Sequence, residues 1–192
     1  MDHQIPSATT RGRFGIRTNE VATAGVLRLV VATLLCGAAG IHFAVTGEHF
    51  TEWTGYGAFF LVLAFFQLLV VFALRPGLDE SFYFGVAFTQ LAVIGIWIAS
   101  RTTGLPVGPM PWRPESVGVP DIIASGFELV AVGLLLTIPW IRRSARMNLR
   151  PAAVLTIAVS IAVITITGWS LVADSHGSEG GMSPAASAAS GH

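Results

Sequence analysis

The chain has 192 residues, of which 53% are hydrophobic and 11% are charged, and its formal net charge is zero. A soluble domain carries roughly 25% charged residues, so this composition is typical of an integral membrane protein. The balanced charge gives no electrostatic footprint for nucleic acid, the absence of a glycine-rich phosphate loop excludes a nucleotide-driven pump, and the single cysteine excludes an intrachain disulfide framework.

Five apolar segments are long enough to cross a bilayer, for which a helix needs roughly 20 residues. In chain order they are residues 25–46, 55–74, 82–100, 121–140 and 152–173. The fold is therefore predicted to be all-α, a five-helix transmembrane bundle over residues 25–173. Residues 1–24 are predicted to be a polar cytoplasmic tail, and residues 174–192, rich in Ser, Gly and Ala, a flexible external tail.

The arginines orient this bundle, because cytoplasmic loops of membrane proteins carry an excess of positive charge. Of the 11 basic residues, all arginine, only Arg101 and Arg113 fall on the opposite side from the N-terminus if the chain crosses five times. We therefore expect a multi-pass protein of a bacterial plasma membrane, with a cytoplasmic N-terminus and an external C-terminus.

The first segment ends in IHFAVTGEHFTEW, residues 41–53. His42 lies four residues before the end of the first span, about 6 Å below the external surface at about 1.5 Å per residue. Gly47 is expected to end the helix, and EHFTEW to form a short interfacial helix anchored by its aromatic residues. His49 and Glu52 would then be neighbours on that helix.

The fourth segment carries a polar face, because Asp121, Ser125 and Glu128 follow helical spacing. An ionisable group as deep as Glu128, about 10 Å below the external end, costs about 2.5–3.5 kcal/mol or more in lipid. We expect Glu128 to face the protein interior, to be paired or to be protonated. The preceding loop, residues 101–120, is rich in Pro and Gly and is expected to form an ordered external cap.

These polar groups are predicted to meet at one depth on the external side. The predicted metal ligands are His42, His49, Glu52, Asp121 and Glu128, and the loop residues Arg101 and Glu115 are predicted to close the site. Imidazole and carboxylate together suit Zn or Cu(II). A weaker copper candidate in the external tail combines His176, Met182 and His192.

Structural roles remain open for the same residues. His42 can be a neutral histidine bonded to Glu128 or to a backbone carbonyl, and Glu128 can be a hydrogen-bonded staple between helices. His49 and its acidic neighbours can belong to a solvated interfacial turn. Gln67 and Gln90 are expected to join helices through hydrogen bonds.

The stretch RTTGLPVGPMPWRPESVGVPDIIASGFE, residues 101–128, together with GIHFAVTGEHFTEW, resembles a family of small actinobacterial multi-pass membrane proteins. That family pairs an RTxGLPxGP loop with a following Glu, Gly, Asp and a helix Glu. The matching positions are Arg101, Gly104, Leu105, Pro106, Gly108, Pro109, Glu115, Gly118, Asp121 and Glu128. The resemblance implies that the loop and two helix ends form one unit, and it carries no activity. Residues 110–112 depart from the small polar residues expected at the loop tip.

Three functions are consistent with this pattern. The first is a membrane protein that binds or handles a Cu or Zn ion at an external His/carboxylate site. The alternative is a non-catalytic accessory or scaffolding subunit of a larger membrane complex, since glycine-rich helices pack closely against other helices or a second copy of the chain. The third, an enzyme using Glu128 and His42 as acid and base, ranks last because no nucleophile or substrate is indicated.

Overall fold

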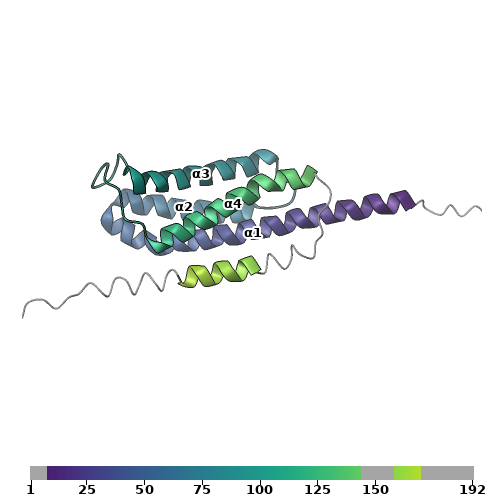
Figure 1. Ribbon diagram of the computed structural model, residues 1–192, viewed down its shortest axis with the longest axis horizontal. Coiled ribbons are helices and arrows are strands. Elements are labelled where there is room, and N and C mark those ends of the chain that lie inside the picture. Colours follow the sequence, from purple (N-terminus) through teal and green to yellow (C-terminus); the bar gives the residue numbers. More distant parts are fainter. Residues whose placement is uncertain (1–7, 144–157, 170–192) are drawn as a thin grey trace, which may run out of the picture.

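The structure, a computed structural model, describes residues 8–143 and 158–169, and the side chains of residues 24–141 and 158–169. Its helices are α1 (Ala8–Glu52), α2 (Thr54–Ala73), α3 (Glu80–Thr102), α4 (Val119–Arg143) and a short helix (Ala158–Trp169) (Figure 1). No strand occurs in the described residues, which confirms the all-α prediction. Four helices are long and apolar enough to cross a bilayer, and the short helix lies inside the fifth predicted segment.

Helix α1 is longer than the sequence predicted. Its 45 residues span about 68 Å at about 1.5 Å per residue, and it projects well beyond the other helices (Figure 1). The helix thus extends through most of the predicted polar tail, because it begins at Ala8. Once the apolar part of α1 has nucleated a helix, each added residue gains a hydrogen bond, so the polar segment continues it.

The expected break at Gly47 does not occur, because α1 runs without interruption to Glu52. One glycine costs a helix only about 1 kcal/mol, and packing against α2 offsets that cost. The chain reverses at Trp53, whose N–H donates to the His49 carbonyl over 2.9 Å. A Cβ on Gly57 would lie 2.3 Å from the Phe50 ring, so only glycine allows this close approach. The end of α1 is thus part of the bundle and not a separate interfacial helix.

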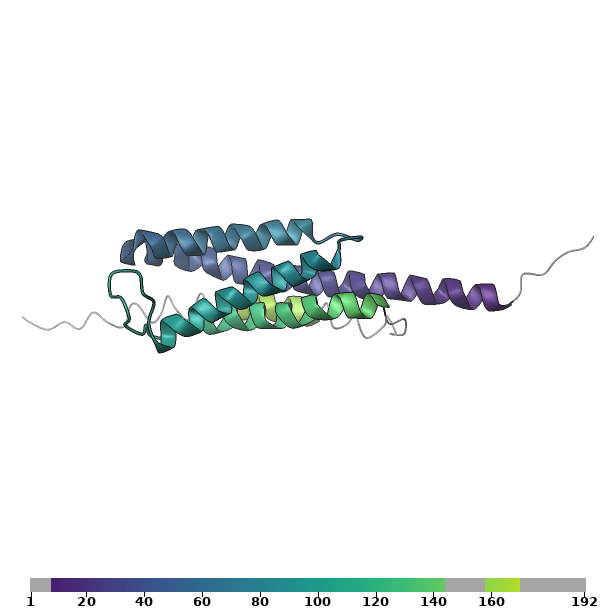
Figure 2. The same ribbon diagram turned by 90° about the horizontal axis from the view of Figure 1, so that it is seen from above.

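The helices pack in the order α2, α1, α4, α3. Helix α1 is central, and its buried stripe recurs at helical spacing through Leu27, Val31, Leu34, Ala38 and Ile41. It packs against α2 and α4, and α4 in turn packs against α3. The consecutive helices α2 and α3 have little contact with each other (Figures 1 and 2). The surfaces of α2 and α3 that face each other therefore contact the loop and line the pocket described below.

Large apolar side chains cover the outer surfaces of α2 and α3. Val62, Phe65, Leu69 and Phe72 on α2, and Phe84 and Phe88 on α3, are all exposed. A water-soluble monomer rarely exposes so many large apolar groups together. The exposed surface, like the helix lengths, is that of a multi-pass membrane protein.

The short helix packs against α1 at Gly37. Val163 is buried, and its Cγ1 would lie 2.6 Å from a Cβ built on Gly37. The hydroxyls of Thr33 and Ser160 are 3.4 Å apart and form a hydrogen bond. Small residues allow such close helix contacts in membranes. The absence of a side chain at Gly37 therefore allows the fifth segment to pack closely against α1.

We expect Gly37→Leu to displace the short helix, because the new side chain overlaps Val163. In a Cys36→Ala background, Thr33→Cys and Ser160→Cys should form a disulfide readily, and Gly37→Leu should reduce its yield several-fold. The matched control is Gly40→Leu, one turn away, where a Cβ meets nothing within 4 Å. Equal disulfide yields in the two leucine variants would show that the short helix does not pack against α1 at Gly37.

Candidate functional site

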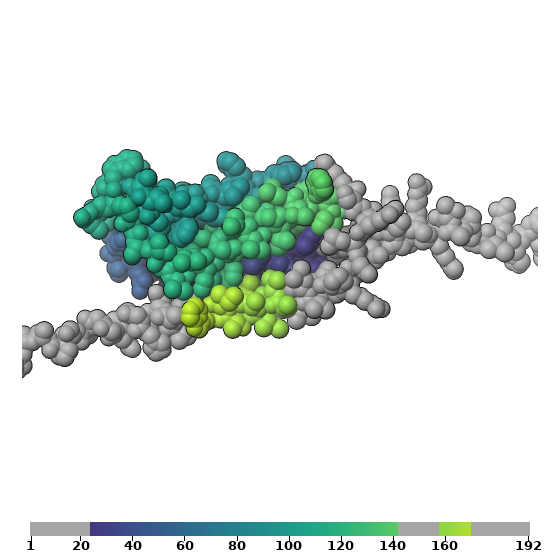
Figure 3. Space-filling view, in the orientation of Figure 1, coloured from purple at the N-terminus to yellow at the C-terminus, as the bar shows by residue number. Residues whose placement is uncertain are grey.

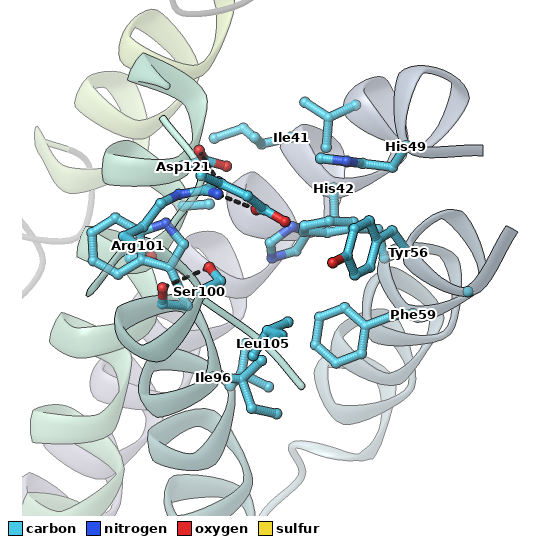
Figure 4. Close-up of a pocket in the computed structure, with 18 of the residues that line it drawn as sticks. Ile41, His42, His49, Tyr56, Phe59, Ile96, Ser100, Arg101, Leu105 and Asp121 are labelled. Atoms are coloured by element: carbon cyan, nitrogen blue, oxygen red, sulfur yellow. Dashed lines mark hydrogen bonds and ion pairs between the residues drawn. The ribbon is translucent and has the colours of Figure 1, made fainter. Parts of the chain in front are cut away.

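A pocket of about 390 Å³ lies at the end of the bundle that carries residues 103–118, called here the loop end. Its floor comes from α1 and α4, and its walls come from α2, α3 and the loop (Figure 4). The volume falls within the range of roughly 300–1,000 Å³ that is usual for small-molecule sites. Its apolar lining is Ile41, Val45, Trp53, Tyr56, Phe59, Phe60, Val93, Ile96, Trp97, Leu105, Val107 and Ala124.

A buried carboxylate stands at the floor of this pocket. Glu128 is 1% exposed, and its Oε1 lies 3.0 Å from His42 Nε2. The same oxygen accepts a hydrogen bond of 2.7 Å from Gln67 Nε2. These contacts join α1, α2 and α4 through one carboxylate oxygen. They supply the partners that a group of this kind requires in an apolar interior.

His49 lies on the same face of α1 as His42, seven residues farther along. Both histidines line the pocket (Figure 4). The His49 ring stacks on Phe60 with a centroid distance of 4.3 Å and an interplanar angle of 16°. Its Nδ1 lies 3.2 Å from Glu52 Oε2. Glu52 itself is exposed and does not line the pocket.

Arg101 closes the loop end. Its side chain is 10% exposed, and its two terminal nitrogens donate to Glu115 and to Asp121, the latter over 2.6 Å. Asp121 Oδ2 also accepts the backbone N–H of Gly118 at 3.1 Å, at the first turn of α4. Carboxylates are favourable at a helix N-terminus. Arg101 thus ties the end of α3 to the loop and to the start of α4.

The loop is ordered by backbone hydrogen bonds and by two glycines with positive φ. Gly104 has φ 74°, and a Cβ there would lie 2.4 Å from the backbone nitrogen of Arg113. The Glu115 N–H donates to the Ser100 carbonyl over 3.0 Å. The Tyr56 hydroxyl donates to the Val107 carbonyl over 3.1 Å, which ties the loop to α2. The loop protrudes at one end of the molecule in Figure 3.

The five residues predicted as metal ligands are divided among three separate contacts. Glu128 pairs with His42, His49 with Glu52, and Asp121 with Arg101. Within residues 24–141 and 158–169, no three His, Cys, Asp or Glu side chains lie close enough to hold a metal ion. The physical reason is that donors on different helices, Gln67 and Arg101, draw the carboxylates apart. The tail candidates His176, Met182 and His192 lie outside the described residues.

The sequence interpretation missed the apolar walls of the pocket and the Gln67 contact. Tyr56, Phe60 and Gln67 follow helical spacing on α2, and this spacing was the available signal. Gln67 does join two helices, as expected. Gln90 on α3 is fully buried, but its amide has no hydrogen-bond partner among the described residues, contrary to the expectation.

Comparisons with protein-family models, with curated proteins and with solved structures gave no match for this chain. The function must therefore be argued from the site itself.

Proposed function

We propose that this integral membrane protein binds a small, largely apolar molecule in the pocket at the loop end. The observation that carries the proposal is a pocket of about 390 Å³ with apolar walls and a buried His42–Glu128 pair at its floor. Known small-molecule sites have the same combination of an apolar lining and a few placed polar groups. A buried ionisable group facing such a pocket within a membrane is a functional candidate.

The ligand is proposed to enter from the lipid, between α2 and α3. These two helices have little mutual contact. Phe59 and Ile96, one on each wall, remain 37% and 41% exposed. A molecule dissolved in the bilayer would meet these apolar edges before it reached Glu128. We propose that the loop end lies on the external side of a bacterial plasma membrane, with the N-terminus in the cytoplasm, and the arginine distribution supports this orientation.

A Cu or Zn ion is the second candidate, and one observation favours it. His42 Nε2 and Glu128 Oε1 are 3.0 Å apart, so an imidazole and a carboxylate already meet in the pocket. An ion there would replace the hydrogen bond between them and would need further ligands, such as water. Glu115 and Asp121 each contact Arg101 through one oxygen, so an ion would compete with the Arg101 guanidinium for these carboxylates.

Co-purification tests both candidates. Wild-type protein and Ser125→Trp are extracted in native-membrane discs, and their small molecules and metals are measured by mass spectrometry. Ser125 lines the pocket, so a tryptophan there fills it. We expect a lipophilic compound that is enriched with wild type and lost in Ser125→Trp. The matched control is Leu129→Trp, because Leu129 is exposed on the same helix outside the pocket lining.

Each outcome separates the functions. A stoichiometric metal lost in Ser125→Trp, with no enriched compound, would replace the first proposal by the metal site. Equal small-molecule and metal content in all three proteins, together with a protein partner retained in all of them, would favour the accessory-subunit role instead.

A further inference from the structure

We propose that the pocket selects a lipophilic amine in its protonated form, with the ammonium group placed against Glu128 and His42. This inference rests on the proposed function and adds the chemical class of the ligand. It depends on which hydrogen-bonding atoms of the pocket are already used and which are left for a ligand.

The atoms left at the floor are acceptors. Both hydrogen bonds to Glu128 end on Oε1, so Oε2 has no partner among the described residues although this residue lines the pocket. When Nε2 of His42 donates to that carboxylate, the other ring nitrogen, Nδ1, is an acceptor. The same reasoning applies to His49, whose Nδ1 faces Glu52. A ligand at this position must therefore bring donors.

Apart from the Ser125 hydroxyl, for which no hydrogen bond occurs among the described residues, the side-chain donors at the rim of the pocket already have acceptors. The terminal nitrogens of Arg101 are bonded to carboxylates, the Tyr56 hydroxyl to the Val107 carbonyl, and the Ser100 hydroxyl to the Trp97 carbonyl. Two N–H groups, Trp97 Nε1 and Arg101 Nε, have no acceptor among the described residues, but they have almost no accessible surface and so are not open to a ligand. A carboxylate or phosphate ligand would find few donors there.

Charge and aromatic rings favour a cation over a neutral donor. The lining holds three carboxyl groups, Glu115, Asp121 and Glu128, but a single guanidinium, Arg101. Aromatic rings attract a cation that lies over their faces. Phe60 lies beside both histidines, with its centroid 5.5 Å from that of His42, and one face of its ring is stacked on His49. An ammonium group would thus meet acceptors and excess carboxylate in a lining that also contains aromatic rings.

The test compares four probes of equal chain length: dodecylamine, dodecyltrimethylammonium, dodecanol and dodecanoate. Their retention by protein-loaded nanodiscs above that of empty nanodiscs is measured by mass spectrometry. We expect dodecylamine to bind wild type about tenfold or more tightly than Glu128→Gln, which is the range for losing a charge-assisted hydrogen bond. Dodecyltrimethylammonium, which has charge but no N–H, should bind more weakly than dodecylamine, and the other two weakest.

The control variant is Glu48→Gln, an exposed carboxylate at the same end of the bundle and outside the pocket lining. It should bind dodecylamine as wild type does. Preferential binding of dodecanol or dodecanoate, lost in Ser125→Trp, would overturn the amine inference while supporting the pocket as a ligand site. Retention of no probe above empty nanodiscs would overturn the inference, and the co-purification experiment would then decide the proposed function separately.

Discussion

Replacing Arg101 by Met should open the loop end and lower the free energy of unfolding by about 3 kcal/mol. Arg101 donates to Glu115 and Asp121 from a side chain that is only 10% exposed. Each hydrogen bond to a charged group contributes about 1.5–3 kcal/mol, and two carboxylates that remain side by side without a cation repel each other. The expected loss lies at the low end of the sum of the two bonds, because 29% of the Glu115 side chain is in contact with solvent.

Hydrogen exchange of residues 103–118 and thermal unfolding in detergent measure this effect. Arg101→Lys should be intermediate, because lysine keeps the charge but not the planar fork that reaches two carboxylates. The matched control is Arg113→Met. Arg113 is exposed, and among the described residues its guanidinium donates only to the Met110 sulfur, at 3.6 Å, so we expect little change. Equal exchange rates in the loop of both Met variants would show that Arg101 does not close the site.

The membrane helices could be predicted from sequence because their signal is local. A run of about 20 apolar residues has few alternatives to a spanning helix. Helix ends are less determined. Gly47 is a local breaking signal, but contacts from α2, including the Phe50–Gly57 approach, hold α1 intact to Glu52. The start of α1 at Ala8 was not predicted, because the polar residues before the first apolar segment carry no apolar helical pattern.

The candidate site was predicted in position but not in arrangement. Depth along each helix follows from counting residues, so His42, Asp121 and Glu128 could be placed at one end of the bundle. Which donor each carboxylate would choose depends on helix rotation and on neighbours far away in sequence. Gln67 lies 61 residues from Glu128, and only the packing order α2, α1, α4 brings them together. Sequence spacing carries no such information, so one cluster was expected where three contacts formed.

The His42–Glu128 contact should show a coupling free energy of about 1.5 kcal/mol in a double-mutant cycle of His42→Leu and Glu128→Leu. His42→Leu leaves Glu128 with Gln67 as its remaining partner, and Glu128→Leu leaves both His42 and Gln67 without it. The loss of the Gln67 bond occurs in the Glu128 single variant and in the double variant, so it cancels in the cycle and the coupling reports the His42–Glu128 contact alone. Hydrogen bonds between membrane helices average about 0.6 kcal/mol with a maximum of about 1.7. Because the Glu128 side chain is only 2% exposed, its contact with His42 should lie at the upper end of this range of coupling free energies. Unfolding in detergent with increasing denaturant measures each variant.

His49 and Glu52 provide the control cycle, since they are the same residue types at 3.2 Å but with side chains 19% and 43% exposed. Their coupling should be close to zero, as for most exposed pairs.

Repeating the His42–Glu128 cycle with added Zn or Cu ions then distinguishes the two candidate ligands. An ion bound between the two groups replaces their hydrogen bond, stabilises only wild type, and increases the measured coupling with ion concentration. An amine that donates to the second oxygen of Glu128 leaves the hydrogen bond in place, so the coupling should stay constant with either ion. Coupling that rises with the ion would favour the metal site over the amine site.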